Sequence, residues 1–191
     1  RFQKRNRIVD GAVAAIPLIL LTPLQALGSV LVFKSLRQRL GGRFIAGVSG
    51  GGALPPYVDK FFQAAGITVL EGYGLTETGP VLAVREQKRP IPGTVGALLP
   101  DVEYKVLGED GRELGPGIKG ELHVRSPQIM EGYYKKPEET ARVLSEDGWL
   151  NTGDLVLFTY DREFRIVGRS KETIVLLGGE NIEPPPIEDA I

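Results

Sequence analysis

Residues 43–71 hold two short apolar runs on either side of a segment with the composition of a helix. The runs are FIAGVSG (44–50) and ITVLE (67–71). The segment between them, PPYVDKFFQAAG (55–66), begins with prolines and ends with glycine, as helices commonly do. Strand, helix and strand at this spacing predict two parallel strands joined by a right-handed crossover. The sequence therefore predicts an α/β layer in this region.

Each predicted strand is followed by a glycine-rich stretch, SGGGALPP (49–56) after the first and EGYGLTETGP (71–80) after the second. Ligands of parallel sheets bind beyond the carboxyl ends of the strands. We therefore expect these two loops to share one pocket.

The following part of the chain is dominated by short alternating strands and turns. These patterns predict a small antiparallel sheet or barrel beside the α/β layer. The predicted elements are strands in VEYKVL (102–107) and GELHVRS (120–126), a helix in PEETARVL (137–144), and hairpins around Asp161-Arg162 and Gly178-Gly179.

The first forty residues contain a basic heptapeptide and then 23 residues without a charge, from Gly11 to Phe33. Such a run is long enough to span a bilayer, but Pro17 and Pro23 interrupt it and argue against a spanning helix. Next, LVFKSLRQRLGG (31–42) has the spacing of an amphipathic helix that ends at two glycines.

Composition excludes several classes of function. The 191 residues carry a net charge of −1, which gives no general attraction for nucleic acid or anionic membrane. The sequence has no cysteine and one histidine, so disulfides, thiolate nucleophiles and multi-histidine metal sites are excluded. His123 alternates with Glu121 and Arg125 along a strand, and we interpret it as a structural or solvated residue.

The stretch EGYGLTETGP offers several groups that could contact a nucleotide. Glu77 could supply a carboxylate to Mg²⁺, which prefers one or two carboxylates together with phosphate oxygens. Thr76 could donate to a phosphate, Tyr73 could stack on a base, and Gly72 and Gly74 would let the backbone approach closely. The alternative is a tight turn whose threonines bond only to the local backbone.

Three other motifs carry candidates of the same kind. The glycines of SGGGALPP suit edge-on contact with a flat ligand, or they serve close packing at the start of a helix. In WLNTGDL, Asp154 follows a Thr-Gly turn and could accept from both hydroxyls of a ribose, or it caps that turn. In GRSKE, Arg169 could reach ribose or phosphate, or it forms a surface ion pair with Glu172.

Taken in order, these motifs resemble the adenylate-forming superfamily of acyl-CoA synthetases, firefly luciferase and peptide-synthetase adenylation domains. The resemblance runs from about residue 43 to residue 191. It is most similar to bacterial and archaeal long-chain fatty acyl-CoA synthetases. The motifs that carry it are GYGLTETG, GELHVRSPQIMEGYYKKPEET, GWLNTGDL and GRSKETIVLLGGENIEPPPIE.

The resemblance implies a two-step reaction with ATP, Mg²⁺ and coenzyme A. A fatty carboxylate attacks the α-phosphate of ATP to give acyl-AMP and pyrophosphate, and the coenzyme A thiol then displaces AMP. A rotation of a small C-terminal domain between the two steps lets one pocket serve both. The implied nucleotide contacts are the adenine at Gly51, Gly52, Ala53 and Tyr73, close backbone approach at Gly72 and Gly74, the ribose at Asp154, and a hinge at Lys171. The implied catalytic residues are Thr76 for the phosphate, Glu77 for Mg²⁺, and Arg169 for ribose or phosphate.

The sequence departs from the family at two points. It contains no Ser/Thr/Gly-rich phosphate loop ending in Lys-Gly, and the family's C-terminal lysine would fall after Ile191. The resemblance therefore implies a fragment that does not complete adenylation alone. Its predicted parts are an α/β portion of the AMP-binding domain (1–95), a β-rich subdomain (96–168), and a hinge with the start of a truncated C-terminal domain (169–191).

The predicted partners are small molecules, namely fatty acid, ATP and coenzyme A, in the cytoplasm and without nucleic acid. Peripheral contact with a membrane and a homodimer stay open. So do two alternative functions: another acyl- or aryl-CoA synthetase, and a nucleotide-binding or assembly module without catalysis. The uncharged run could pack in the core, line an acyl tunnel or touch lipid.

Overall fold

The computed structural model describes residues 33–172 and the backbone of residues 174–175 and 181–182. The uncharged run lies outside this range except for Phe33, as do the turn of the second predicted hairpin and most of the predicted hinge region. Within the described part, no helix has both the length and the apolar character needed to cross a membrane.

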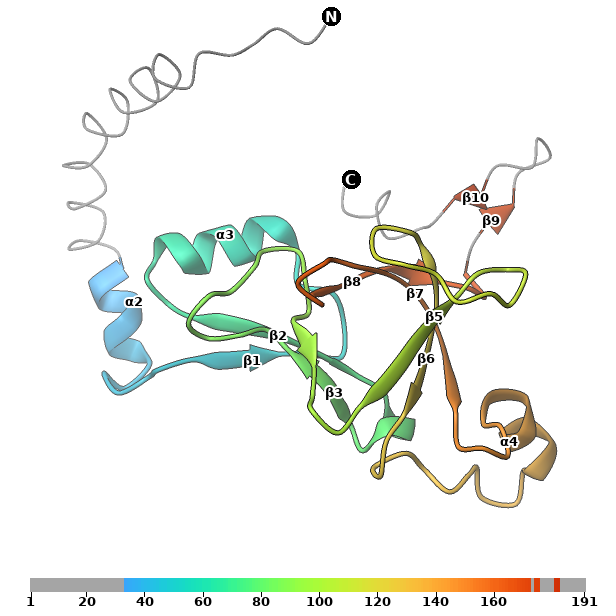
Figure 1. Cartoon of the computed structure of the whole chain (residues 1–191). Coiled ribbons are helices and arrows are strands. Elements are labelled where there is room, and N and C mark those ends of the chain that lie inside the picture. The colour runs from blue at the N-terminus through green and yellow to red at the C-terminus, as the bar shows by residue number, and fades with distance from the viewer. Residues whose placement is uncertain (1–32, 173, 176–180, 183–191) are drawn as a thin grey trace, which may run out of the picture.

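The first sheet has four strands in the order β1-β2-β3-β4, and it confirms the predicted crossover (Figure 1). Its first two strands are parallel and are joined through a helix that begins at Pro56, as the sequence predicts. The other two strands are antiparallel additions that were not predicted. The elements are α2 (Lys34–Arg39), β1 (Gly47–Ser49), α3 (Pro56–Ala64), β2 (Val69–Gly74), β3 (Val81–Val84) and β4 (Ala97–Leu98).

The predicted loop after β2 begins later than the sequence indicated. Strand β2 continues through Gly74 because β3 pairs with it, Gly72 opposite Val84 and Tyr73 opposite Ala83. Only then does the chain turn, through a short 3₁₀ helix, Thr76–Thr78. The motif is therefore half strand and half turn.

The second sheet is antiparallel, in the order β5-β6-β7-β8, and among the described residues it is an open sheet rather than a closed barrel. Buried and partly exposed residues alternate along β6 and β7, as expected when one face covers a core. The elements are β5 (Glu103–Leu107), β6 (Gly120–Arg125), α4 (Pro137–Val143), β7 (Leu150–Phe158) and β8 (Phe164–Arg169), followed by the antiparallel pair β9 (Ile174–Val175) and β10 (Asn181–Ile182).

One hydrophobic core joins the two sheets. Leu82 and Ala83 of β3 belong to the same buried cluster as Leu122, Val156 and other residues of the second sheet. The sheets are also joined through the backbone at Gly96, just before β4, whose carbonyl accepts from the N–H of Phe164 in β8 at 2.9 Å. Gly96 has φ +88°, and a Cβ there would collide with the backbone of Val84, so only glycine fits.

Candidate functional site

A cavity of about 490 Å³ lies between the ends of β1 and β2 and the inner side of β7 and β8. The carboxyl ends of β1 and β2 lie at the same edge because these strands are parallel, with Ser49 opposite Glu71. The two glycine-rich motifs therefore line one cavity. The predicted site residues in its lining are Gly51, Gly52, Ala53, Gly72, Tyr73, Gly74, Asp154 and Arg169.

Asp154 is the centre of the polar side of this cavity. Its side chain is 5% exposed, and each carboxylate oxygen accepts one hydrogen bond: Tyr73 Oη donates to Oδ2 at 2.6 Å, and Arg169 Nε donates to Oδ1 at 2.8 Å. Burial and the charge of Asp154 raise the pKa of Tyr73 far above its ordinary value, so the phenol is a neutral donor at physiological pH. The hydrogen bond to Asp154 likewise raises the pKa of Arg169.

A bulge in β7, rather than the turn that the sequence suggested, sets the position of Asp154. Gly153 lies inside the strand with φ +70°, and its N–H donates to the side chain of Asn151 at 2.8 Å. The Thr152 hydroxyl donates to the Leu122 carbonyl and accepts from the Asp154 N–H. These bonds satisfy the interrupted ladder and turn Asp154 to the core side of the sheet, where the cavity lies.

The two glycines of β2 line the cavity and also pack closely against other parts of the protein. A Cβ on Gly74 would fall on the Pro80 carbonyl, and one on Gly72 would press on Val48 at 3.2 Å. Close approach at these two positions is therefore required by neighbouring strands, in addition to any ligand.

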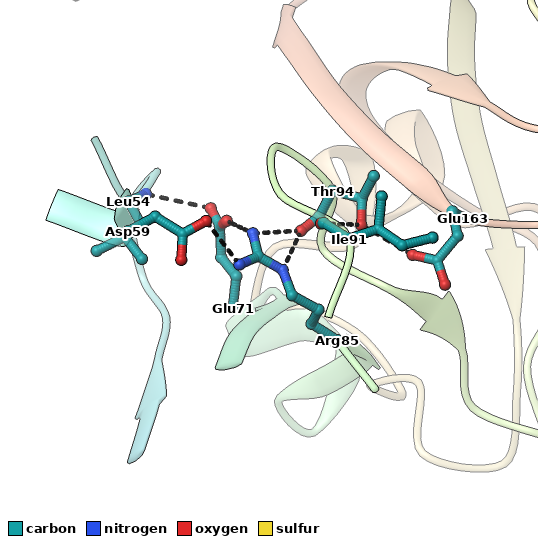
Figure 2. Close-up of polar contacts among 7 residues, drawn as sticks. All are labelled: Leu54, Asp59, Glu71, Arg85, Ile91, Thr94 and Glu163. Carbon is teal, nitrogen blue, oxygen red and sulfur yellow. Dashed lines mark hydrogen bonds and ion pairs between the residues drawn. The ribbon is translucent and has the colours of Figure 1, made fainter. Parts of the chain in front are cut away.

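A buried ionic network is centred on Arg85 and includes Glu71, which lines the cavity (Figure 2). Arg85, 1% exposed, donates to Asp59 at 3.0 Å, to Glu71 Oε2 at 2.6 Å and to the Thr94 carbonyl. The other oxygen of Glu71 accepts from the Leu54 N–H at 3.1 Å. Burial raises the pKa of Glu71, against the opposing effects of Leu54 and Arg85. Glu71 thus ties the first glycine-rich loop to β2, and Arg85 holds Glu71.

The same network reaches the second sheet. The Thr94 hydroxyl lies 2.8 Å from Glu163 Oε2, in the turn that precedes β8 (Figure 2). Arg85 could not be singled out from the sequence, because it stands in the polar run REQKRP (85–90) and belongs to none of the motifs. Its burial depends on partners 14 and 26 residues away.

A second cavity of about 450 Å³ accounts for two of the three remaining predicted residues, while Thr76 is in the lining of neither cavity. Glu77 and Lys171 line the second cavity, and it shares Leu75, Arg169 and Glu172 with the first cavity. The two cavities are therefore neighbours, and Arg169 stands between them.

Glu77 is placed to hold a cation only together with another ligand. The described residues contain no group of three or more His, Cys, Asp or Glu that could hold a metal ion. A single carboxylate fits Mg²⁺ that arrives with phosphate oxygens. Thr76, at the start of the turn, is exposed, and Thr78 is buried with its hydroxyl bonded to the Leu75 and Pro80 carbonyls and accepting from the Leu75 N–H.

His123 provides a pH-dependent contribution to stability. Burial lowers its pKa, and the nearby Lys105 adds to this effect while Glu121, 3.6 Å away, opposes it. The neutral imidazole is favoured in the folded state, so this contribution is complete above the unfolded pKa of about 6.5 and is lost as the pH falls below it. We expect His123→Gln to reduce the loss of stability between pH 7.5 and 5.5 in urea denaturation; an unchanged slope would contradict this assignment.

Comparisons with known proteins identify the family of this chain. The sequence matches the family model described as AMP-binding enzyme over residues 12–134. The chloroplastic long-chain-fatty-acid–acyl-carrier-protein ligase AEE15 of Arabidopsis thaliana is 42% identical over 193 residues, which cover 95% of this chain and 26% of the relative. The long-chain-fatty-acid–CoA ligase of Salmonella typhimurium is 37% identical over 148 residues, which cover 75% of this chain and 26% of that ligase.

Among solved structures, ATP-bound MatB from Rhodopseudomonas palustris matches with a TM-score of 0.68 and 34% identity over 74% of this chain and 28% of that chain. The chain thus spans about a quarter of the length of the curated relatives that it matches.

Proposed function

Because this chain belongs to the AMP-binding enzyme family, we propose that it supplies the adenylate-binding part of a long-chain fatty acid–CoA ligase of the AMP-forming type. In that reaction a fatty carboxylate attacks the α-phosphate of ATP, pyrophosphate leaves, and the coenzyme A thiol then displaces AMP from the acyl-AMP. The observation that carries the proposal is the chain of contacts Tyr73–Asp154–Arg169 in the cavity beside the glycine-rich loop.

Asp154 retains the capacity to bind a ribose while it keeps its present partners. An ionised carboxylate has about four acceptor positions on its two oxygens. Tyr73 and Arg169 use one position on each oxygen. One position on each oxygen is therefore left, which matches the two adjacent hydroxyls of a ribose.

The other roles are proposed from the family resemblance, and the position of Glu77 and Lys171 beside this ribose site supports them. The adenine lies against Tyr73, with its edge toward the first loop, and the phosphates extend toward the second cavity. Mg²⁺, when bound with ATP, supplies positive charge that offsets the charge developing on the phosphates. The proposed ligands are Gly51, Gly52, Ala53, Gly72, Tyr73 and Gly74 for adenine, Asp154 and Arg169 for ribose, Thr76 for phosphate, Glu77 for Mg²⁺, and Lys171 as the hinge.

The acyl substrate and the setting are proposed from the relatives. The bacterial relative is named a long-chain-fatty-acid–CoA ligase, which supports a fatty acid as the carboxylate, and we place the reaction in the cytoplasm.

A second candidate acceptor is the thiol of acyl carrier protein. The relative named an acyl-carrier-protein ligase is 42% identical to this chain, whereas the Salmonella CoA ligase is 37% identical. Both acceptors present a phosphopantetheine thiol, so the adenylate half-reaction is unchanged. The acceptor is identified by incubating a ligase that contains this chain with radiolabelled fatty acid, ATP and either coenzyme A or acyl carrier protein. Label on coenzyme A supports the first proposal. Label on the carrier protein alone means that the carrier protein is the acceptor instead.

A thermal-shift titration with non-hydrolysable acyl-adenylate analogues tests the proposed function of the chain. A ligand at 100 times its dissociation constant adds about 2.7 kcal/mol of stability to the native state. We expect every analogue to raise the melting temperature, and longer acyl tails to raise it further. Free fatty acid serves as the control for nonspecific binding of the tail. Equal shifts with analogue and fatty acid, or no shift with any analogue, would contradict the proposal.

A further inference from the structure

The segment before α4 contacts the turn that carries Glu77. Tyr133 Oη donates to Glu77 Oε1 at 2.8 Å across a separation of 56 residues. Both residues line the second cavity. In Figure 1 the chain that leads into α4 passes beside the turn after β2.

From this contact we infer that Tyr133 is a positioning residue, which orients the Glu77 carboxylate for a divalent cation bound with the phosphates of ATP. The inference rests on the proposed function of Glu77. It adds a residue that acts through Glu77 and has no other assigned role in the site.

The backbone of Glu77 is fixed independently of its side chain. Its carbonyl accepts from the Met130 N–H at 2.9 Å. Within the turn, the buried Thr78 hydroxyl accepts from the Leu75 N–H at 2.9 Å and donates back to the carbonyls around it. The torsions that remain free are those of the Glu77 side chain itself, and the Tyr133 hydroxyl restrains them.

Tyr133 is held on its own side as well. Its N–H donates to the Thr140 hydroxyl at 2.9 Å, and that hydroxyl donates to the Lys136 carbonyl at 2.9 Å. Gly132 allows the segment before α4 to approach Thr140 closely, because a Cβ at Gly132 would lie 2.8 Å from the Thr140 side chain. The phenol is therefore presented by an ordered segment rather than by a mobile loop tip.

The hydrogen bond from Tyr133 leaves one oxygen of the Glu77 carboxylate available to a ligand. In the described part of the chain, Glu77 Oε1 has the Tyr133 bond and no hydrogen bond or ion pair involves Oε2. A carboxylate with one oxygen fixed and one available matches a cation that takes a single protein ligand and completes its shell with phosphate and water.

The test is a calorimetric titration of the 191-residue chain with ATP at several Mg²⁺ concentrations, and with AMP without Mg²⁺. Tyr133→Phe removes only the hydroxyl. We expect it to weaken Mg²⁺-dependent ATP binding about 3- to 10-fold, the net value of one ordinary hydrogen bond, with AMP binding unchanged. Tyr134→Phe, at a neighbouring side chain that is 85% exposed, is the matched control and should leave both affinities unchanged.

Each other outcome overturns the inference in a recognisable way. If Tyr133→Phe behaves like Tyr134→Phe, Tyr133 does not position Glu77, although the proposed function stands. If Tyr133→Phe weakens AMP and ATP equally, its role is general structure. If the unsubstituted chain binds AMP but gains nothing from Mg²⁺, the metal role of Glu77 fails, and if it binds neither nucleotide, the proposed function fails as well.

Discussion

Asp154→Ala is expected to reduce the affinity of the chain for AMP at least about 100-fold, which corresponds to about 2.7 kcal/mol. The substitution removes the proposed acceptor of both ribose hydroxyls. It also leaves the Tyr73 hydroxyl without its acceptor at 2.6 Å and releases the Arg169 guanidinium from its bond at 2.8 Å. Three groups that define the polar side of the cavity are therefore lost or displaced together.

Equilibrium dialysis or calorimetry with AMP measures this effect. Asp161→Ala, at an exposed carboxylate in the turn between β7 and β8, is the control and should bind as the unsubstituted chain does. Asp154→Asn should be intermediate, because its amide keeps one acceptor but places a donor opposite either Tyr73 or Arg169. An Asp154→Ala chain that is folded and binds AMP within twofold of the unsubstituted chain would show that the ribose does not bind here.

Arg85→Met is expected to lower the free energy of unfolding by about 3–5 kcal/mol. The side chain is 1% exposed, and its loss leaves the carboxylates of Asp59 and Glu71 buried without their cation. A domain of this size has a total stability of about 5–15 kcal/mol, so the loss is a large fraction of it. Glu71 would also lose its restraint, and the loop that it holds through Leu54 would loosen.

Urea denaturation followed by the fluorescence of the single tryptophan measures this loss. Arg89→Met, an exposed arginine in the same polar run, is the control and should change the unfolding free energy by less than about 0.5 kcal/mol. Adding Asp59→Asn and Glu71→Gln to Arg85→Met should recover part of the loss, because no unpaired charge is then buried. A loss below about 1 kcal/mol for Arg85→Met would mean that the network is not a main source of stability.

The crossover was predictable because its signals are local. Proline at the start of α3, glycine at its end and apolar runs on either side each depend on a few neighbouring residues. Strand β3 was missed because VLAV is only four residues long and has no alternation to separate it from a buried turn. Without β3, the extension of β2 through Tyr73 could not be anticipated, since that extension depends on pairing.

The candidate site likewise has residues that local motifs indicated and contacts that depend on distant parts of the chain. Tyr73 and Asp154 could be singled out from motifs, yet the hydrogen bond between them joins positions 81 residues apart and follows only from the packed sheets. The Thr-Gly before Asp154 suggested a turn. Glycine with a positive φ occurs both in turns and in β-bulges, and the sequence does not distinguish the two. Arg85 and Tyr133 carried no usable signal, since their partners come from distant elements.

A crystal structure of the chain with AMP tests the proposed adenylate site most directly. We expect the adenine to lie against the Tyr73 ring beside the loop of Gly51 and Gly52. We also expect both ribose hydroxyls to lie within hydrogen-bonding distance of the Asp154 carboxylate. AMP bound elsewhere, or density in this cavity with the ribose turned away from Asp154, would contradict the proposed adenylate site.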